Sequence, residues 1–338
     1  FKQKTAYEIM PSLVGSEMCI RDRDKSLLKK APKLMGMTGL INTSEKDLEK
    51  IIHDNVVLYD FWTYSCINCI RTLPHITAWD EKYNEDGLVI IGIHTPEFEF
   101  EKNKDNVVAA VKKFGINYPV VLDNNKEIWK SFENRYWPRK YITDNEGYIR
   151  FDHIGEGAYK ETELVIQELL QENKNQINTS QVVEIEEYKH STLRTPELYF
   201  GYEFASGRNQ LGNIEGFQPN KIIDYRLPEN IRQHYFYLDG QWENGKDGMK
   251  LISSSGKIVL NFHAKQLNIV AAGDNELEIL IDGKMVESSI AGNDVESSMV
   301  RILEPRLYNI IESFYGESHT ITINVKKPNF EIFTFTFG

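Results

Sequence analysis

Short apolar runs alternate along residues 25–172 with segments whose apolar residues recur at helical spacing. The runs "NVVLYDF" and "GLVIIGIH" are rich in β-branched residues, which is typical of buried strands. "SEKDLEKIIH" predicts a short amphipathic helix, with Ser44 as its N-cap and Asp47 in its first turn. The same criteria predict helices over residues 66–84, 104–115, 125–134 and 159–172, and strands over residues 118–123, 137–144 and 148–154.

The order of these elements indicates the fold class of the first part of the chain. Asn145-Glu146-Gly147 is a turn signal between two predicted strands, so we expect that pair to be antiparallel. The earlier strands are separated by helices, as in βαβ units. Residues 25–172 are therefore predicted to form an α/β domain with a mixed sheet flanked by helices.

Helical periodicity disappears after residue 190. Alternating runs such as "HYFYLDGQW", "KIVLNFHA", "ELEILIDGKMV" and "FEIFTFTF" follow one another, separated by Gly, Asn and Asp. Their spacing of roughly ten residues predicts an all-β jelly-roll or β-sandwich domain over residues 191–338. Residues 173–190 are polar and rich in Gln, Asn and Glu, so we interpret them as a linker.

The charge of the chain narrows the class of partner. Over 338 residues the formal net charge is −11, and no cluster of Lys and Arg stands out. Nucleic acids and anionic membranes bind positive surfaces, so we expect neither as a partner. No window approaches the roughly 18 apolar residues that a membrane-spanning helix needs.

The first residues differ in character from the rest. "AYEIMPSLVGSEMCIRDR" lacks the basic start and the apolar stretch of a secretory signal, and it resembles translated adapter sequence. We expect residues 1–24 to be a non-native leader and assign no role to Cys19. The true N-terminus and any export signal are not visible in this segment.

The sequence holds two other cysteines, in "CINC" at Cys66 and Cys69, between a predicted strand and a predicted helix. The first cysteine lies where free N–H groups and the helix dipole favour thiolate over thiol. The second, one turn later, is close enough to attack a mixed disulfide made by the first. This placement predicts a redox-active dithiol.

Three neighbours support this prediction. Asp60 lies in an apolar strand six residues before Cys66, and a buried carboxylate is costly unless it has a function. We expect it to exchange a proton with Cys69; the alternative is a strand-end residue that faces water. Trp62 is expected to pack beside the cysteine turn, and Pro74 to kink the helix.

The cysteine pair has three alternative interpretations. A structural zinc needs four ligands, and the chain has no second CxxC, while His75 and His94 are expected to be turn or surface residues. Peroxiredoxins place a Thr three residues before the reactive cysteine, as Thr63 stands here, but they also need a proline where Tyr59 stands. A copper chaperone would need CxxxC spacing.

"YDFWTYSCINCIRTLP" resembles the active site of the thioredoxin-like superfamily. The resemblance implies a cis-proline opposite the cysteines, and Pro138 in "RYWPRKYITDNEG" occupies that place. The backbone before such a proline pairs with an incoming peptide. Trp137 is therefore either a substrate contact or a core residue. An extra segment at about residues 102–122 is similar to the TlpA-like branch.

"HTPEFEFEKN", "GEGAYKETE" and "TPELYFGYEF" closely resemble the C-terminal, extracytoplasmic half of DipZ-type proteins. That resemblance implies a thioredoxin-like domain followed by a β-sandwich similar to carbohydrate-binding modules. It also implies an extracytoplasmic or periplasmic location, with a cytoplasmic one as the alternative. Full DipZ-type proteins add a membrane electron relay, so an electron donor is expected but not identified. His94 and Glu97 either tune the thiols or have structural roles.

We predict a thiol–disulfide oxidoreductase that acts on protein disulfides. Its catalytic residues would be Cys66, Cys69 and Asp60. Its substrate-binding residues would be Pro138, Trp137 and Trp62. No metal or cofactor other than the Cys66–Cys69 disulfide is expected.

Two alternative functions are a peroxiredoxin-like peroxidase and a β-sandwich ligand-binding protein with an accessory redox domain. In the second case Trp242, Tyr235 and Tyr237 would make weak carbohydrate contacts, since aromatic faces suit sugar rings. Otherwise these residues belong to a core, and the β-sandwich docks on the redox domain or on a partner.

Overall fold

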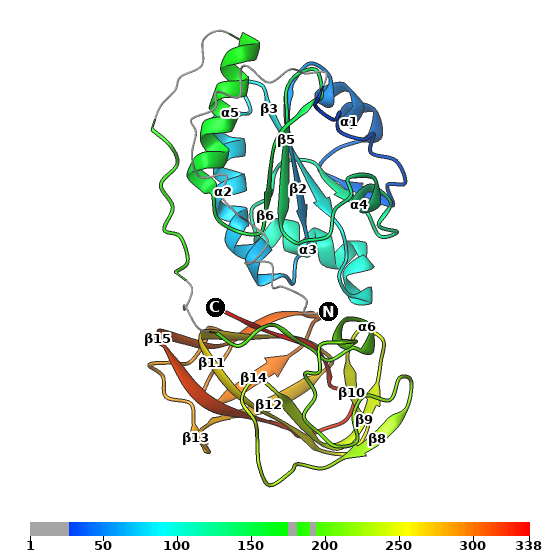
Figure 1. The fold of residues 1–338 in the computed structure, drawn as a ribbon, viewed down its shortest axis with the longest axis vertical. Helices are drawn as coiled ribbons and strands as arrows, with labels where there is room; N and C mark the ends of the chain where they lie inside the picture. Colours follow the sequence, from blue (N-terminus) through cyan, green and yellow to red (C-terminus); the bar gives the residue numbers. More distant parts are fainter. Residues whose placement is uncertain (1–26, 175–180, 190–193) are drawn as a thin grey trace.

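The computed structural model describes residues 27–174, 181–189 and 194–338. They form two domains, one above the other in Figure 1; the first is α/β and the second consists almost wholly of strands. The predicted leader and parts of the predicted linker lie outside the described residues. The limits proposed for those two segments therefore stay predictions.

The first domain contains the helices and strands that the periodicity predicts, with small shifts at their ends. Its strands are β1 (Gly39–Ile41), β2 (Val56–Trp62), β3 (Leu88–His94), β4 (Val120–Leu122), β5 (Arg139–Thr143) and β6 (Ile149–Ile154). Its helices are α1 (Glu45–Ile52), α2 (Ile67–Tyr83), the 3₁₀ helix η4 (Glu99–Lys102), α3 (Lys104–Lys113), α4 (Glu127–Ser131) and α5 (Tyr159–Lys174). Ser44 caps α1 as predicted, because its hydroxyl oxygen accepts the N–H of Asp47.

These strands form a six-stranded sheet in the order β1-β4-β3-β2-β5-β6. β2 runs parallel to β3 and β3 runs parallel to β4, whereas β5 is antiparallel to both β2 and β6. The predicted mixed sheet is confirmed, and so is the antiparallel pair around Gly147, whose φ of 82° suits glycine at a turn.

Helices cover both faces of this sheet (Figure 1). α2, α3 and α5 pack on one face and α1 and α4 on the other. Side chains alternate along a strand, so Val56, Leu58 and Trp62 of β2 point toward α2, and Asp60 lies on the same face. The alternation therefore places a carboxyl group behind the helix that carries the cysteines.

The second domain is built from strands of very unequal length. They are β7 (Leu198–Tyr199), β8 (Ile222–Tyr225), β9 (Phe236–Asn244), β10 (Met249–Leu251), β11 (Gly256–Ala272), β12 (Asn275–Ile281), β13 (Lys284–Met285), β14 (Met299–Ile302), β15 (Arg306–Val325) and β16 (Glu331–Phe337). A short helix, α6 (Tyr202–Ala205), lies between the first two.

These strands wrap around one apolar core. Hydrogen bonds link them into a ten-stranded sheet, in which β11 pairs with β15, β16 and β9. The pairing of β11 with β15 shifts register at two bulges, and bulges bend strands. The predicted all-β domain is confirmed, with its layers joined through these long bent strands.

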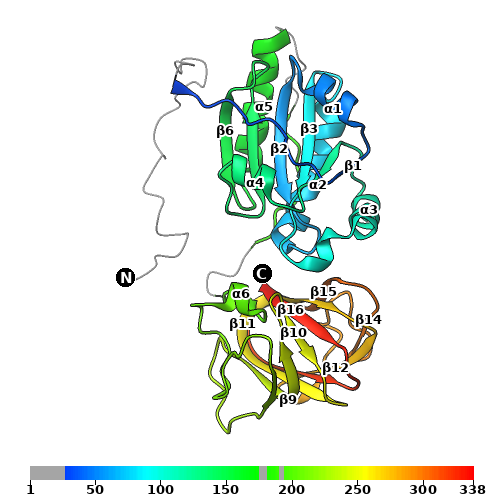
Figure 2. The same cartoon turned by 90° about the vertical axis from the view of Figure 1, so that its right-hand side faces the viewer.

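An apolar contact joins the two domains. Phe98 and Phe100, in the loop after β3, pack against Phe333 with ring centroids 5.2 and 4.7 Å apart. Phe204 of α6 adds an edge-on contact with Phe98 at 5.9 Å. On the other side of the junction, Gly338 lies beside Arg71 of α2, and Figure 2 shows this end of the chain next to the first domain. The expected docking of the β domain on the redox domain is thus observed.

Part of the predicted linker packs on the first domain. Val183 contacts its core, and the Val183 N–H donates to Glu163 of α5 at 2.7 Å. Farther along, the guanidinium of Arg71 lies 3.7 Å from the centre of the Tyr188 ring. The described part of this segment, residues 181–189, therefore follows the surface of the domain. Within the described ranges, no helix is long and apolar enough to cross a membrane.

Candidate active site

The two cysteines of "CINC" lie at the start of α2. Cys66 is the N-cap residue, and its Sγ accepts the backbone N–H of Cys69 at 3.3 Å. Cys66 is partly exposed whereas Cys69 is only 1% exposed, and both are free thiols. One thiol can therefore meet a substrate while the other lies behind it.

The electrostatic setting of Cys66 differs from the expected one. Burial raises its pKa, hydrogen bonds with Cys69 lower it, and the charges of Glu97 and Glu197 raise it further. The net direction is upward, so the helix N-terminus does not outweigh burial and the two acids. Burial also raises the pKa of Cys69 well above its ordinary value, with contributions from Cys66 and Asp60.

Asp60 is buried, as predicted, so the water-facing alternative is wrong. Neither of its carboxyl oxygens has a hydrogen-bond partner among the described residues. Burial raises the pKa of Asp60 to about 7, although the charge of Lys140 acts in the opposite direction. A carboxyl group with this pKa can give or take a proton near neutral pH.

The positive charge that acts on Asp60 is that of Lys140, a residue that the sequence did not single out. It lies opposite Asp60 in the register between β2 and β5 and is fully buried. Its Nζ lies 3.4 Å from the Gly155 carbonyl oxygen and 5.4 Å from the centre of the Tyr159 ring. Burial lowers the pKa of Lys140 to about 8, while Asp60 and Cys69 raise it. The sequence does carry a signal for it, because a lysine stands inside the predicted strand "RKYIT".

The three residues predicted to bind substrate have different surroundings. Trp62 is fully buried and its ring is edge-on to that of His94 at 5.2 Å, so its predicted substrate contact is wrong. The reason is strand alternation, which points Trp62 into the core beneath α2. Trp137 is half-buried, donates from Nε1 to the Thr95 carbonyl oxygen at 3.0 Å and precedes Pro138 through a cis peptide bond. The substrate contacts of Trp137 and Pro138 stay predictions.

The two histidines are also placed differently from the prediction. His75 and His94 are 3% and 0% exposed, so neither is a surface residue. Burial lowers the pKa of His94 to about 3; burial, helped by Lys140, lowers that of His75 to about 4. Both are therefore neutral at pH 7 and serve as stacking partners, His94 for Tyr64 and His75 for Tyr159. In the described ranges, no three His, Cys, Asp or Glu side chains are grouped to hold a metal.

A second buried acid, also missed, lies on the other side of the cysteine turn. Glu101 of η4 accepts the hydroxyl of Ser65 at 2.6 Å and the backbone N–H groups of Glu97 and Phe98 at 2.6 and 2.9 Å. Ser65 directly precedes Cys66. The acidic loop after β3 is therefore joined to the cysteine turn by these hydrogen bonds.

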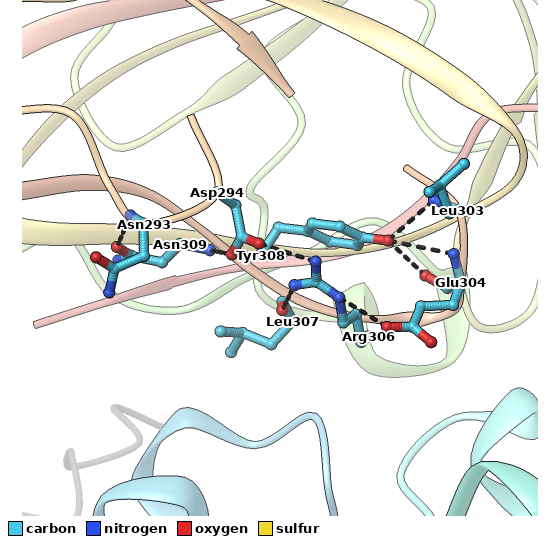
Figure 3. A network of polar contacts seen from close by, with 8 residues as sticks. All are labelled: Asn293, Asp294, Leu303, Glu304, Arg306, Leu307, Tyr308 and Asn309. Carbon is cyan, nitrogen blue, oxygen red and sulfur yellow. Dashed lines mark hydrogen bonds and ion pairs between the residues drawn. The ribbon is translucent and has the colours of Figure 1, made fainter. Parts of the chain in front are cut away.

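A cavity of about 100 Å³ lies beside the cysteine turn, between the domains. Tyr64, Ile70 and Ala109 line it from the first domain, and residues 304–307 from the second. Figure 3 shows how that second wall is held: Arg306 contacts Asp294 and Glu304, and hydrogen bonds join the Tyr308 hydroxyl to the backbone of residues 303–304. The second domain thus borders the cysteine turn with an ordered surface.

Two of the predicted sugar-binding aromatics of the second domain are buried, Trp242 at 0% and Tyr237 at 1% exposure. Trp242 points from β9 into the apolar core, whereas Tyr237 lies on the other face, with its ring against Gly212 and its hydroxyl accepting the Arg232 N–H. Stacking of these two on a sugar ring is therefore excluded. Tyr235 is partly exposed, and the guanidinium of Arg232 lies 4.1 Å from the centre of its ring.

Comparison with known proteins agrees with this architecture. Residues 28–152 match the AhpC/TSA family, and residues 195–338 match the family described as thioredoxin like C-terminal domain. The chain is 34% identical over 312 residues to Protein DipZ of Mycobacterium bovis, covering 91% of this chain and 43% of that protein. The chain thus spans less than half the length of this curated relative.

Two further similarities concern the first domain. The thiol-disulfide oxidoreductase YkuV of Bacillus subtilis is 27% identical over 143 residues, which cover 42% of this chain and 95% of that protein. A solution structure of a thioredoxin-like protein in the oxidized form is 25% identical, covers 44% of this chain and 98% of its own, and has a TM-score of 0.40. The two family matches confirm the predicted superfamily: an AhpC/TSA-family domain over residues 28–152 precedes a thioredoxin-like C-terminal domain over residues 195–338.

Proposed function

We propose that the protein is a thiol–disulfide oxidoreductase that acts on disulfides in polypeptides. The observation that carries this proposal is the pair of free thiols at the start of α2, one partly exposed and one buried. The N–H of Cys69 points at the Sγ of Cys66, so it stabilises negative charge there when the thiol ionises or leaves.

The proposed reaction has two steps. The Cys66 thiolate attacks a substrate disulfide, whose S–S bond breaks as a mixed disulfide forms and one substrate thiolate leaves with a proton. Cys69 then loses its proton and attacks the Sγ of Cys66. The second substrate thiol is released, and a Cys66–Cys69 disulfide remains. Two electrons have passed to the substrate, so a reduced dithiol donor must restore the enzyme.

Asp60 is proposed to take the proton of Cys69 in the second step. Both groups are buried, and the charge of Asp60 is felt at Cys69. The pKa of Asp60, about 7, suits transfer in either direction at neutral pH. Before the transfer Lys140 compensates the charge of the Asp60 carboxylate, because it lies opposite Asp60 on the next strand; the transfer leaves a neutral Asp60 and a Cys69 thiolate, whose charge also acts on Lys140.

Pro138 and Trp137 are proposed to hold the substrate chain. Trp137 is partly exposed, and its ring is fixed by Trp129 at 4.2 Å and by the hydrogen bond to Thr95. A fixed aromatic surface loses little conformational entropy on binding.

The location, the electron donor and the cofactor are part of the same proposal. Similarity to DipZ over 91% of the chain supports an extracytoplasmic protein supplied by a membrane electron relay. The Cys66–Cys69 disulfide would be its redox group.

The test replaces each cysteine and follows reduction of a peptide disulfide by dithiothreitol. Cys66→Ser should abolish exchange, because the attacking thiol is gone. Cys69→Ser should accumulate a mixed disulfide that mass spectrometry detects. Cys19→Ser is the matched control and should keep full activity. Full multiple turnover by Cys69→Ser would sink the two-step mechanism.

A thiol peroxidase is the second candidate, favoured by the AhpC/TSA match. Thr63, which such enzymes would use beside the cysteine, is buried with its hydroxyl 3.4 Å from His94 Nε2. Hydrogen peroxide consumption at a rate comparable to peptide disulfide reduction would favour this candidate instead.

A further inference from the structure

A cavity of about 330 Å³ lies between α2, the loop after β6 and the segment of residues 185–188. Arg71 and His75 line it from α2, Tyr159 from the start of α5 and Glu156 from the loop. The segment itself runs from α5 toward the second domain (Figure 1). None of the residues proposed to take part in the exchange lines this cavity, so the exchange chemistry does not account for it.

The cavity is close to the reacting cysteine and to the predicted substrate-binding proline. Arg71 follows Cys66 by five residues, a rise of about 7 Å along the helix. On the facing wall, the N–H of Gly155 donates to the Pro138 carbonyl oxygen at 2.8 Å, and Glu156 is the next residue. An extended peptide covers about 3.3 Å per residue. A chain bonded to Cys66 and held at Pro138 therefore reaches the cavity with a residue about two to four positions from its own cysteine.

The third wall, residues 185–188, is fastened on both sides. Before it, the N–H of Val183 donates to Glu163 at 2.7 Å. At its end, the ring of Tyr188 lies 3.7 Å from the guanidinium carbon of Arg71. The segment that the sequence predicts to be a linker therefore supplies a held wall of this cavity.

Two buried polar groups in the walls have no hydrogen-bond partner among the described residues. One is Nδ1 of His75, a residue that is 3% exposed. The other is Nη1 of Arg71, whose side chain is 10% exposed and which lies 3.6 Å from Glu156 Oε1. Buried polar groups are normally paired, so a ligand of the cavity is expected to supply partners. A neutral imidazole nitrogen can accept a hydrogen bond and a guanidinium donates, so this ligand should carry both a donor and an acceptor.

The charges around the cavity select the sign of the ligand. Glu156, Glu186 and Glu187 line it, whereas the one cation among its described wall residues is the guanidinium that pairs with Glu156. The rings of Tyr159 and Tyr188 line it as well, and aromatic faces attract cations. A lysine or arginine side chain fits these walls, because its N–H groups find acceptors while a backbone carbonyl beside it accepts from the guanidinium.

We propose that this cavity is the specificity site of the exchange, and that it receives a lysine or arginine side chain of the polypeptide substrate, close in sequence to the substrate cysteine. The proposal rests on the exchange proposed at Cys66 and adds the class of substrate, disulfides flanked by basic residues. The segment between the two domains then takes part in recognition, because residues 186 and 187 carry two of the carboxylates.

The experiment compares two disulfide-linked peptides that differ only in carrying Lys or Gln three residues before and after each cysteine. The full chain reduces them with dithiothreitol as donor, and the uncatalysed rate of each peptide is subtracted. The kcat/KM for the Lys peptide should be about fivefold higher than for the Gln peptide, the scale of one ion pair at 4 Å in water.

Variants locate the preference within the chain. Glu186→Gln combined with Glu187→Gln should bring the ratio of the two kcat/KM values below twofold. Glu184→Gln is the matched control and should keep the ratio, because Glu184 is exposed on the same segment but does not line the cavity.

Binding is measured separately from the chemistry. Isothermal titration calorimetry uses the same peptides with Ser in place of each Cys, and the Lys peptide should bind about fivefold more tightly than the Gln peptide. His75→Phe keeps a ring to stack on Tyr159 but removes the ring nitrogens, so it should weaken binding of the Lys peptide.

Three results would overturn the proposal. They are equal kcat/KM values for the two peptides, a full preference in the double glutamine variant, and a preference that Glu184→Gln lowers as much, which would mean that net charge rather than the cavity attracts the peptide. Equal reduction of both peptides would leave the proposed exchange intact. Preferred binding of the Lys peptide without reduction of either disulfide would instead refute the proposed function.

Discussion

The two domains bury different kinds of polar side chain. Among the described residues of the first domain, the buried polar groups include charged or titratable ones: Asp60, His75, His94, Glu101, Asp123, Lys140, Asp144, Arg150 and Glu163. In the described part of the second domain they are neutral amides and hydroxyls, such as Asn213, Asn244, Asn268, Asn309 and Thr334. Neutral groups satisfy one another at any pH, whereas buried charges respond to it.

Within the first domain, hydrogen-bond partners distinguish the buried charges that have a structural role from those that can take part in the reaction. Glu163 accepts hydrogen bonds from Trp79, Lys82 and Tyr83, and it lies away from the cysteines. Asp60, behind Cys69, has no such partner among the described residues. An acid that is buried without hydrogen bonds is expected where a proton must move, so the contrast locates the chemistry.

The largest effect is expected from Lys140→Met. It leaves Asp60 without its opposite charge, which should lower the free energy of unfolding by about 4 kcal/mol at pH 8. The loss should be smaller at pH 6, because Asp60, with a pKa of about 7, then takes up a proton. Urea unfolding at both pH values measures this. Equal losses of stability at the two pH values would contradict the coupling of the two charges. So would a Lys140→Met variant that regains no stability when Asp60→Asn is added.

Asp60→Asn should slow the release of substrate about a hundredfold at pH 7, the typical contribution of general acid–base catalysis. The asparagine has a similar shape but cannot take the proton of Cys69. Stopped-flow decay of the mixed disulfide measures the step. The attack by Cys66 should change much less, and equal slowing of both steps would argue for a structural role.

The same variant tests stability against pH. The folded pKa of Asp60, about 7, lies above its ordinary 3.8, so between these values the folded chain keeps a proton that the unfolded chain loses. The free energy of unfolding therefore falls as pH rises through this window. Asp60→Asn should gain stability relative to the wild type from pH 4 to 7. A difference that is constant with pH would show that Asp60 does not titrate in this way.

Asn309→Ala tests the neutral core of the second domain. The Asn309 amide donates to Asn268 at 2.9 Å and accepts the N–H of Asn293 at 2.8 Å, as Figure 3 shows for the latter. Leaving these groups unpaired should cost about 2 kcal/mol. The loss should be the same at pH 5 and pH 8. A marked pH dependence would break the contrast between the domains.

The smallest effect is expected from Asp282→Asn, at the surface of the second domain. Slight burial raises the pKa of Asp282, but the hydrogen bonds from His319 and the Thr320 N–H outweigh it, so the net shift of that pKa is downward. A depressed carboxyl pKa adds stability that is lost as pH falls through that pKa. Because the pair is exposed, the variant should lose only about 0.5 kcal/mol at pH 6. A loss of several kcal/mol would mean that the second domain also depends on charge.

Local features of this protein were readable in its sequence. The helix and strand periods, the Ser44 cap, the position of Cys66 at a helix start and the burial of Asp60 all depend on neighbours within a few residues. Pro138 was identified from resemblance, and its cis bond is present. These features follow from backbone hydrogen bonding and side-chain alternation, which a short segment already determines.

Other features were decided only when distant segments met. Lys140 lies opposite Asp60 because of the register between β2 and β5, and Tyr199 reaches Glu97 across 102 residues of sequence. Trp62, His94 and Trp242 are core residues because other elements cover them, which a local pattern does not show. Pairing register and domain docking are set by packing over the whole chain. For this reason the sequence alone located the cysteine site, and the tertiary structure supplied its surrounding charges.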